Sequence, residues 1–170
     1  MPASSEDFRS LMGTFPTGVA VVTAMNSSGQ PRGMTCSSLC SVSLTPPILL
    51  VCLRHGSSTL EAVLDQGRFS VNLLHSESQV VAELFASAAA LERFHRVDWH
   101  MDPDGCGPHL TADAHSIADC EVSTMQHVGD HAVVFGTVLR ISRQNDQSPL
   151  LYGLRRFTTW PLEQVYEYQP

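Results

Sequence analysis

The sequence predicts a mainly β protein, an antiparallel barrel or sandwich with a few short helices around it. Apolar stretches of strand length recur along the chain, and turn signals separate them. The predicted helices do not alternate regularly with these strands, as a doubly wound α/β sheet would require. That second fold is the weaker alternative, because no G-x-G-x-x-G motif follows any predicted strand.

The N-terminal third predicts a helix and two buried strands. The helix is predicted because its apolar residues recur at helical spacing, at Phe8, Leu11, Met12 and Phe15. Ser4 and Asp7 are its predicted capping pair. The run "VAVVTAM" at 19–25 is a buried strand, and "NSSGQPRG" is the turn after it. A second apolar run, "ILLVCLR" at 48–54, predicts another buried strand.

The middle third predicts two further helices around one strand. "SSTLEAVLDQG" reads as a helix with Ser58 and Glu61 as its capping box and Gly67 at its C-terminal cap. "RFSVNLLH" at 68–75 is the strand. The next helix is "SESQVVAELFASA" at 76–88, with Ser76 and Gln79 as its capping pair, and 99–108 is a loop.

The last third is mostly strand. From 118 to 124 apolar and polar residues alternate, so Asp119 and Glu121 are predicted on a solvent-exposed face. "HVGDH" at 127–131 predicts a hairpin turn, and "AVVFGTVLRIS" returns beside the previous strand. Gly136 in that strand indicates a bulge or a close backbone approach. The segment "LLYGLRRFTTW" at 150–160 is a final strand or an irregular segment.

Composition limits the function classes. The chain has 170 residues, is 43% hydrophobic and carries a net charge of −7, so we expect one globular domain spanning 1–170. There is no basic run for nucleic acid and no apolar run of membrane-spanning length. All ten basic residues are Arg, so an Arg fork must make any charged phosphate contact. The five Cys residues form no framework and no leader is evident, so we expect a cytoplasmic protein that binds neither membrane nor nucleic acid.

Metal and nucleophile chemistry are both disfavoured. His127 and His131 are four apart but flank a Gly-Asp turn, and no H-E-x-x-H motif or clustered Cys/His set occurs, so no metal is expected. No G-x-S-x-G elbow is present. Cys52 lies in an apolar run, where a cysteine usually acts as a small core residue.

The segment "MTCSSLCSVSLTPP" at 34–47 remains to be explained. It holds six Ser or Thr residues and no charged side chain, and it lies beside a predicted core strand. One explanation is a loop whose hydroxyls satisfy local backbone groups. The other is a cradle of neutral donors for a flat heterocycle or a phosphate. Arg54 and the helix start "SSTLE" follow closely and could hold an anion, so the second explanation indicates a phosphorylated aromatic cofactor.

Six segments of the chain resemble the flavin reductase-like family, the short NAD(P)H:flavin oxidoreductases with an FMN-binding split barrel. In order along the chain they are "FPTGVAVVTA", "RGMTCSSLCSVSLTPPILLVCL", "SSTLEAVLDQGRFSVNLL", "VAELFA", "GDHAVVFGTV" and "PLLYGLRRF". The resemblance extends from about Phe8 to Trp160. It implies an antiparallel split β-barrel, FMN or FAD as the flavin, and NADH or NADPH as the co-substrate. Leu39 stands where the family often has Phe, which leaves the choice of flavin open.

The resemblance also implies roles for individual residues. The ring and ribityl chain of the flavin would be lined by Thr35, Ser37, Ser38, Ser41, Val42 and Ser43. The phosphate end would be held by Arg54, Ser58 and Thr59. The same pocket would be flanked by Asn72 and Leu73, with Arg93 and Phe94 as a basic-aromatic pair near the flavin. His131 matches the family histidine near the nicotinamide and is the candidate catalytic residue.

We therefore expect a homodimeric flavin reductase that supplies diffusible reduced flavin to a separate monooxygenase or halogenase. Hydride transfer is carried by the cofactors, so a neutral cradle that stacks two rings suffices. The alternative is a binding protein of the same fold that keeps its flavin as a tightly bound electron carrier. A flavin-free structural barrel is the weakest alternative, because it leaves the hydroxyl cradle unexplained.

Overall fold

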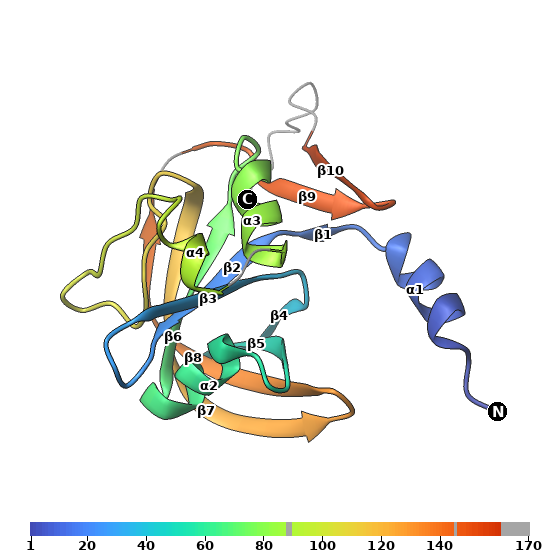
Figure 1. Cartoon of the computed structure of the whole chain (residues 1–170), viewed down its shortest axis with the longest axis horizontal. Helices are drawn as coiled ribbons and strands as arrows, with labels where there is room; N and C mark the ends of the chain where they lie inside the picture. Colours follow the sequence, from blue (N-terminus) through green and yellow to red (C-terminus); the bar gives the residue numbers. More distant parts are fainter. Residues whose placement is uncertain (88–89, 145, 161–170) are drawn as a thin grey trace.

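The computed structural model describes residues 1–87, 90–144 and 146–160 (Figure 1). The helices of this part are α1 (Ser5–Gly13), α2 (Ser58–Gln66), α3 (Gln79–Ser87) and α4 (Ala90–Arg93). The strands are β1 (Thr17–Gly18), β2 (Ala20–Met25), β3 (Pro31–Cys36), β4 (Leu39–Leu44), β5 (Pro47–Arg54), β6 (Arg68–Leu74), β7 (Ala114–Val128), β8 (His131–Arg143), β9 (Leu150–Gly153) and β10 (Arg156–Thr159). The mainly β prediction is confirmed, and "LLYGLRRFTTW" forms two strands and a turn.

The main sheet curls into a barrel because of how its two edges are connected. Its seven strands lie in the order β3-β2-β6-β7-β8-β5-β4, and neighbouring strands pair antiparallel. The edge strands β3 and β4 follow each other in sequence, with only Ser37 and Ser38 between them. The two edges must therefore meet at these serines. A smaller sheet, β1-β9-β10, lies against the barrel beside α3 (Figure 1). The predicted antiparallel split barrel is confirmed.

The core fills the barrel with apolar side chains that alternate along each strand. Val51 and Leu53 of β5 and Val134 of β8 are fully buried there. Gly136 of β8 faces the ring of Phe69, and a Cβ atom at position 136 would lie 2.6 Å from that ring. The register between β7 and β8 also shifts opposite this glycine. Both features predicted for Gly136, the bulge and the close approach, are present.

The helix starts differ in part from the sequence prediction. Ser4 caps α1 by accepting a hydrogen bond from the backbone N–H of Asp7, as predicted. Gly67 ends α2 in the left-handed conformation with a φ of 64°, also as predicted. The N-terminal cap of α2, however, is Ser57 and not Ser58. Helix α3 begins at Gln79, and the N–H of Ala82 donates to the carbonyl of Ser78, so the predicted start at Ser76 is too early.

The predicted exposure of Asp119 is wrong. Asp119 was expected on a solvent-exposed face of β7, but its side chain is fully buried. The loop between α4 and β7 covers that face, and the N–H of Cys106 and the ring of His109 both reach the Asp119 carboxylate at 2.9 Å. Alternation along a single strand could not reveal this loop, because the loop is distant in sequence from the residues that it covers.

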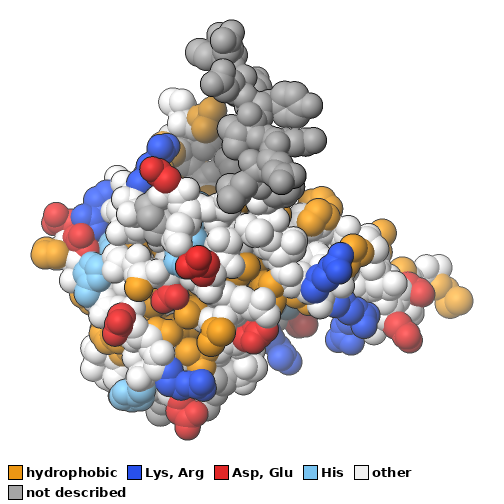
Figure 2. All heavy atoms as spheres, turned by 90° about the horizontal axis from the view of Figure 1, so that it is seen from above, with side chains coloured by type: hydrophobic (Ala, Val, Ile, Leu, Met, Phe, Trp, Pro, Cys, Tyr) orange, Lys and Arg blue, Asp and Glu red, His pale blue; other side chains and the backbone are white. Residues whose placement is uncertain are grey.

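Helix α1 stands apart from the barrel (Figure 1). None of its residues is buried, and Phe8, Leu11 and Phe15 are 59%, 65% and 62% exposed. Figure 2 shows this arm from above, with basic and hydrophobic side chains exposed along it. Its amphipathic pattern is present, but the described part of the chain leaves the apolar side chains of the helix exposed. Among the described residues, no helix is long and apolar enough to cross a membrane.

Candidate functional site

The junction of the two barrel edges places the hydroxyl-rich segment at the surface of the barrel. The backbone N–H of Cys52 on β5 donates to the carbonyl of Ser38 at 3.3 Å, and the Ser38 hydroxyl donates back to the Cys52 carbonyl at 3.2 Å. These two bonds hold the β3–β4 connection against β5. Ser37, on the same connection, remains exposed and lines three adjoining cavities.

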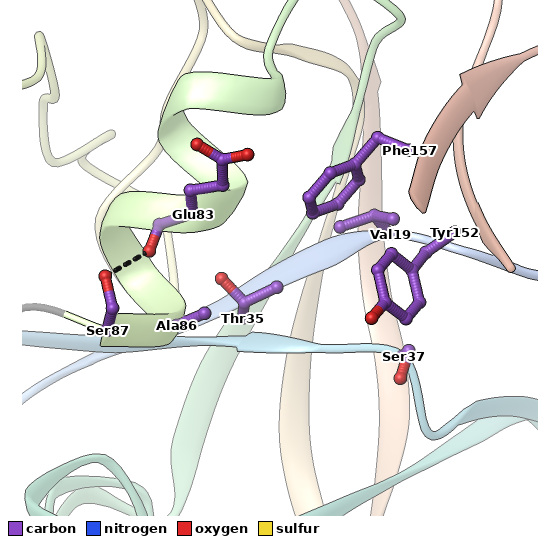
Figure 3. A pocket seen from close by; sticks show the side chains of 8 residues that line it. All are labelled: Val19, Thr35, Ser37, Glu83, Ala86, Ser87, Tyr152 and Phe157. Carbon is purple, nitrogen blue, oxygen red and sulfur yellow. Dashed lines mark hydrogen bonds between the residues drawn. The ribbon is translucent and has the colours of Figure 1, made fainter. Parts of the chain in front are cut away.

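The first cavity lies between α3, β3 and the β9–β10 hairpin, and it has a volume of about 440 Å³ (Figure 3). Its lining residues are Val19, Thr35, Ser37, Glu83, Ala86, Ser87, Tyr152 and Phe157. The rings of Tyr152 and Phe157 are 5.0 Å apart and tilted by 58°. Among the described residues that line this cavity there is no Arg, and Glu83 is the one that is charged. Aromatic walls with few polar groups are typical of a site for an uncharged flat ring.

The hydroxyls of this region differ in what they can offer a ligand. Thr35 donates its hydroxyl hydrogen to the carbonyl of Ala82 at 2.6 Å, which ties β3 to α3. Ser38 donates its own to Cys52. Both hydroxyls can therefore only accept a further hydrogen bond. Ser37 makes no side-chain hydrogen bond within the described part of the chain, so its hydroxyl can donate or accept.

The largest cavity of those found here among the described residues, about 820 Å³, lies between α1 and the barrel. Its lining residues are Arg9, Met12, Gly13, Phe15, Thr17, Ser37, Ser38, Leu39, Cys40, Leu50, Cys52, Tyr152 and Arg155. Ser37 and Tyr152 also line the first cavity, so the two cavities share a wall. A third cavity of about 280 Å³, partly lined by Leu73, adjoins both at Ser37. The three cavities therefore adjoin one another at Ser37, and together this hollow has room for more than one ring.

Arg54 and His131 extend one wall of this hollow. They are register partners on β5 and β8, so their side chains lie on the same face of the sheet. Arg54 is two residues beyond Cys52, which lines the largest cavity, and alternate residues of a strand share a face. The ring of His131 is 2.8 Å from the Asp130 carboxylate. The hydrogen bond from His131, with the nearby Arg54 charge, holds the pKa of Asp130 below its usual value.

The predicted site residues separate into those that line these cavities and those that do not. Thr35, Ser37, Ser38 and Leu73 line them, and Arg54 and His131 lie along the same wall. The β4 residues Ser41, Val42 and Ser43 lie on an edge strand, outside the linings of these three cavities. Ser58 is half-buried and Thr59 fully buried in the first turn of α2. The predicted roles of these β4 and α2 residues stay predictions.

Three further predicted site residues make contacts outside these three cavities: Asn72, Arg93 and Phe94. The buried Asn72 amide donates to the Val21 carbonyl and accepts from the N–H of Leu110, so its side chain serves the core. Arg93 donates to the carbonyl of Gly33, and burial lowers the pKa of its guanidinium. Phe94 is 6% exposed and packs edge-on against the ring of Phe85. The side chains of Asn72 and Phe94 are buried and lie outside the linings of these three cavities, and their predicted place beside the flavin stays a prediction.

Several lining residues were not predicted from the sequence. Tyr152 and Phe157 form the aromatic wall of the first cavity, Glu83 of α3 faces them, and Arg9 and Arg155 line the largest cavity. The signal for the aromatic pair was present, since "PLLYGLRRF" places two aromatic residues around a turn. The sequence could not predict that α1 lines the largest cavity, because this depends on where an otherwise exposed helix lies relative to the barrel.

Comparisons with known proteins agree on one family. The family described as "Flavin reductase like domain" matches residues 12–161. The chain is 51% identical to a flavin reductase (NADPH) from Lentzea aerocolonigenes over 161 residues, which cover 94% of this chain and 92% of that protein.

Solved structures agree. The NADH:FAD oxidoreductase SgcE6 of Streptomyces globisporus C-1027, in complex with NAD and FAD fragments, is similar with a TM-score of 0.85 and 30% identity, covering 96% of this chain and 98% of that one. BorF, the flavin reductase component of a bacterial two-component tryptophan halogenase, is similar with a TM-score of 0.83 and 30% identity, covering 93% and 99%.

Proposed function

The chain belongs to the flavin reductase-like family, and we propose from this that it catalyses the NAD(P)H-dependent reduction of FMN or FAD. The observation that carries the proposal is the pair of cavities that share Ser37 and Tyr152. Reduction of a flavin by a nicotinamide requires two flat rings to lie against each other, and two adjoining cavities, one of them walled by Tyr152 and Phe157, suit that requirement.

The flavin, when bound, supplies the electron-accepting ring, and the protein supplies orientation. Ser37 is the hydroxyl that remains able to donate to a ring oxygen or nitrogen. Thr35 and Ser38 have given their hydrogens to backbone carbonyls, so they are suited to accept from a ring N–H. We assign the ring edge to these three residues, with Tyr152 and Phe157 as the apolar wall beside them.

Arg54 is the proposed anchor for the flavin phosphate, together with Ser58 and Thr59 at the start of α2. Arg54 is exposed and shares a sheet face with Cys52, so its guanidinium can reach a ligand that extends along this wall. His131 beside it is the proposed contact of the nicotinamide. The side chain of His131 is 41% exposed, which leaves it accessible to a ligand.

We propose a two-fold homodimer as the working assembly, with 1–170 acting as one domain. Hydrophobic side chains of α1 are exposed, and so are Val42 and Leu44 on the edge strand β4 and Ile141 on β8. A second copy of the chain would cover such surfaces. It would also bring a surface against Ser41, Val42 and Ser43, which gives these predicted residues a place at the interface.

The proposed product is diffusible reduced flavin, used by a separate monooxygenase or halogenase in the cytoplasm. The similarity to BorF, a reductase component of a two-component system, supports this division of labour. All five cysteines are free thiols, which fits a reducing compartment. The test is the rate of NADH and NADPH oxidation with added FMN, FAD or riboflavin. We expect oxidation that depends on both protein and flavin, and a rate no faster than without protein would refute the proposal.

A further inference from the structure

The largest cavity contains two arginines for which the proposed function has no use so far. Arg9 of α1 and Arg155 of the β9–β10 turn both line it, and both are exposed. Within the described part of the chain, neither side chain makes a hydrogen bond or an ion pair. None of the described residues that line this cavity is an Asp or a Glu. The chain as a whole carries a charge of −7, yet this cavity has two cations and no carboxylate among the described residues that line it.

The backbone holds Arg155 in a conformation that a side chain disfavours. Leu154 and Arg155 have φ angles of 52° and 58°, in the left-handed region where glycine is normally found. Non-glycine residues in this region persist only where the surroundings fix them, and they cluster at ligand sites. Leu154 and Arg155 form the two-residue loop of the β9–β10 hairpin, where a type I′ turn requires a positive φ at both positions, so this turn fixes where the Arg155 backbone lies.

Two contacts lock this turn to the end of α1. The backbone N–H of Leu154 donates to the carbonyl of Gly13 at 2.7 Å. Gly153 lies so close to Pro16 that an added Cβ would be 3.1 Å from it. Arg9 lies about one helical turn before Gly13. The same contacts therefore bring the segments that carry Arg9 and Arg155 to one end of the cavity.

Charge divides the hollow into two parts. The first cavity has aromatic walls, no arginine and one carboxylate, from Glu83. The α1 end of the largest cavity has two guanidinium groups and no carboxylate. A nucleotide has the same division, with a flat uncharged ring at one end and phosphate at the other, and guanidinium forks bind phosphate oxygens in pairs.

We propose that Arg9 and Arg155 together bind a nucleotide phosphate at the α1 end of the largest cavity, as a second phosphate site distinct from Arg54. The inference rests on the proposed function, since that function requires two nucleotides. The nicotinamide nucleotide is the expected source of this phosphate, because FMN carries a single phosphate and Arg54 is its proposed anchor. A response of FMN to the two substitutions would instead move the flavin phosphate from Arg54 to Arg9 and Arg155.

The test compares ligands that differ only by a phosphate. Affinities of FMN and riboflavin are measured by flavin fluorescence, and those of nicotinamide mononucleotide and nicotinamide riboside by calorimetry. In Arg155→Gln and Arg9→Gln we expect the phosphate-bearing member of one pair to lose roughly 10- to 100-fold in affinity, while its phosphate-free partner is unchanged. The pair that responds identifies the source of the phosphate.

Two further variants separate this effect from misfolding and from net charge. Arg156→Gln makes the same charge change at the adjacent exposed residue, which lies outside the linings of these cavities, and should leave all four affinities unchanged. Arg155→Gly removes the left-handed strain, so it should fold at least as stably as the parent and still lose phosphate affinity.

The proposal is overturned if Arg155→Gln leaves the affinities of both phosphate-bearing ligands intact. It is also overturned if phosphate-bearing and phosphate-free ligands weaken equally. Neither result affects the proposed function, which depends on flavin-dependent oxidation of NAD(P)H by the unaltered protein. If the unaltered protein failed to oxidise NAD(P)H, the four binding measurements would still test whether Arg9 and Arg155 bind phosphate.

Discussion

Replacing Asp119 by Asn should destabilise the protein strongly, and more at neutral than at acidic pH. The buried carboxylate accepts a hydrogen bond from the Ser70 hydroxyl at 2.6 Å and from the backbone N–H of Cys106 and the ring of His109, each at 2.9 Å. Arg140 adds two more, from Nε at 3.1 Å and Nη2 at 2.9 Å. Asp119 thereby fastens the loop between α4 and β7 to strands β6, β7 and β8.

The expected loss of stability follows from the groups that would lose their partner when the Asp119 carboxylate becomes an amide. Asn keeps one acceptor oxygen but removes the negative charge that faces Arg140 and turns a donor toward other donors. Removing one member of a buried ion pair costs about 3–5 kcal/mol. Arg140 is 32% exposed on its side chain and keeps Asp102 at 2.8 Å, so we expect the lower end, about 3 kcal/mol at neutral pH.

The pH dependence has a definite sign. Burial alone would raise the pKa of Asp119, but the hydrogen bonds from His109, Cys106, Ser70 and Arg140 outweigh it and hold that pKa well below its usual value. A carboxyl group with a lowered pKa in the folded state stabilises the protein above its unfolded pKa of about 3.9. That contribution is lost as the pH falls through the folded value, so the difference between parent and variant should shrink below about pH 4.

Urea unfolding at neutral pH and at a series of acidic pH values measures this difference. Asp104→Asn is the matched control, because it makes the same change at an exposed residue of the same loop, and it should lie within about 0.5 kcal/mol of the parent. A cost below about 1 kcal/mol for Asp119→Asn would refute the reasoning, since it would mean that the lost charge matters little. A cost that stays constant below pH 4 would refute the assigned pKa direction.

Three further predictions concern the proposed site and assembly. Arg54→Ala should weaken FMN roughly 10- to 100-fold and riboflavin little, and equal weakening of the two in a binding titration would contradict the phosphate role. His131→Ala should raise the KM for NADH or NADPH and leave flavin affinity nearly unchanged, so unaltered nucleotide kinetics would remove His131 from the site. Light scattering should give the mass of a dimer, and Leu11→Glu on the exposed face of α1 should shift it toward monomer. A monomer mass for the parent would contradict the assembly.

Local patterns in the sequence predicted most of the barrel. The strands at 48–54 and 68–75 and the hairpin at Gly129 are set by apolar runs and turn residues close in sequence, and all three are present. The role of Gly136 could be predicted, because a glycine inside a strand usually marks a bulge or a close backbone approach. The caps of α2 and α3 were misplaced by one to three residues, because neighbouring serines can each serve as a cap and the backbone geometry decides between them.

The site was predicted less completely, for a physical reason. Ser37 and Ser38 were recognised as unusual because uncharged hydroxyls beside a core strand need a partner. The sequence could not show that the Asn72 side chain lies in the core, because an amide can hydrogen-bond to buried backbone groups or to a ligand equally well. Arg9 and Tyr152 are far apart in the chain, and only the fold brings both to the same cavity.

The central claim is that the chain reduces flavin as an exchangeable substrate. The most direct measurement mixes a small amount of protein anaerobically with a large molar excess of FMN or FAD and with NADH or NADPH, and follows the loss of flavin absorbance. We expect all of the flavin to be reduced, far more than one equivalent per chain, at a rate proportional to the protein concentration. Reduction that stops at an amount equal to the protein would contradict it and identify a tightly bound electron carrier instead.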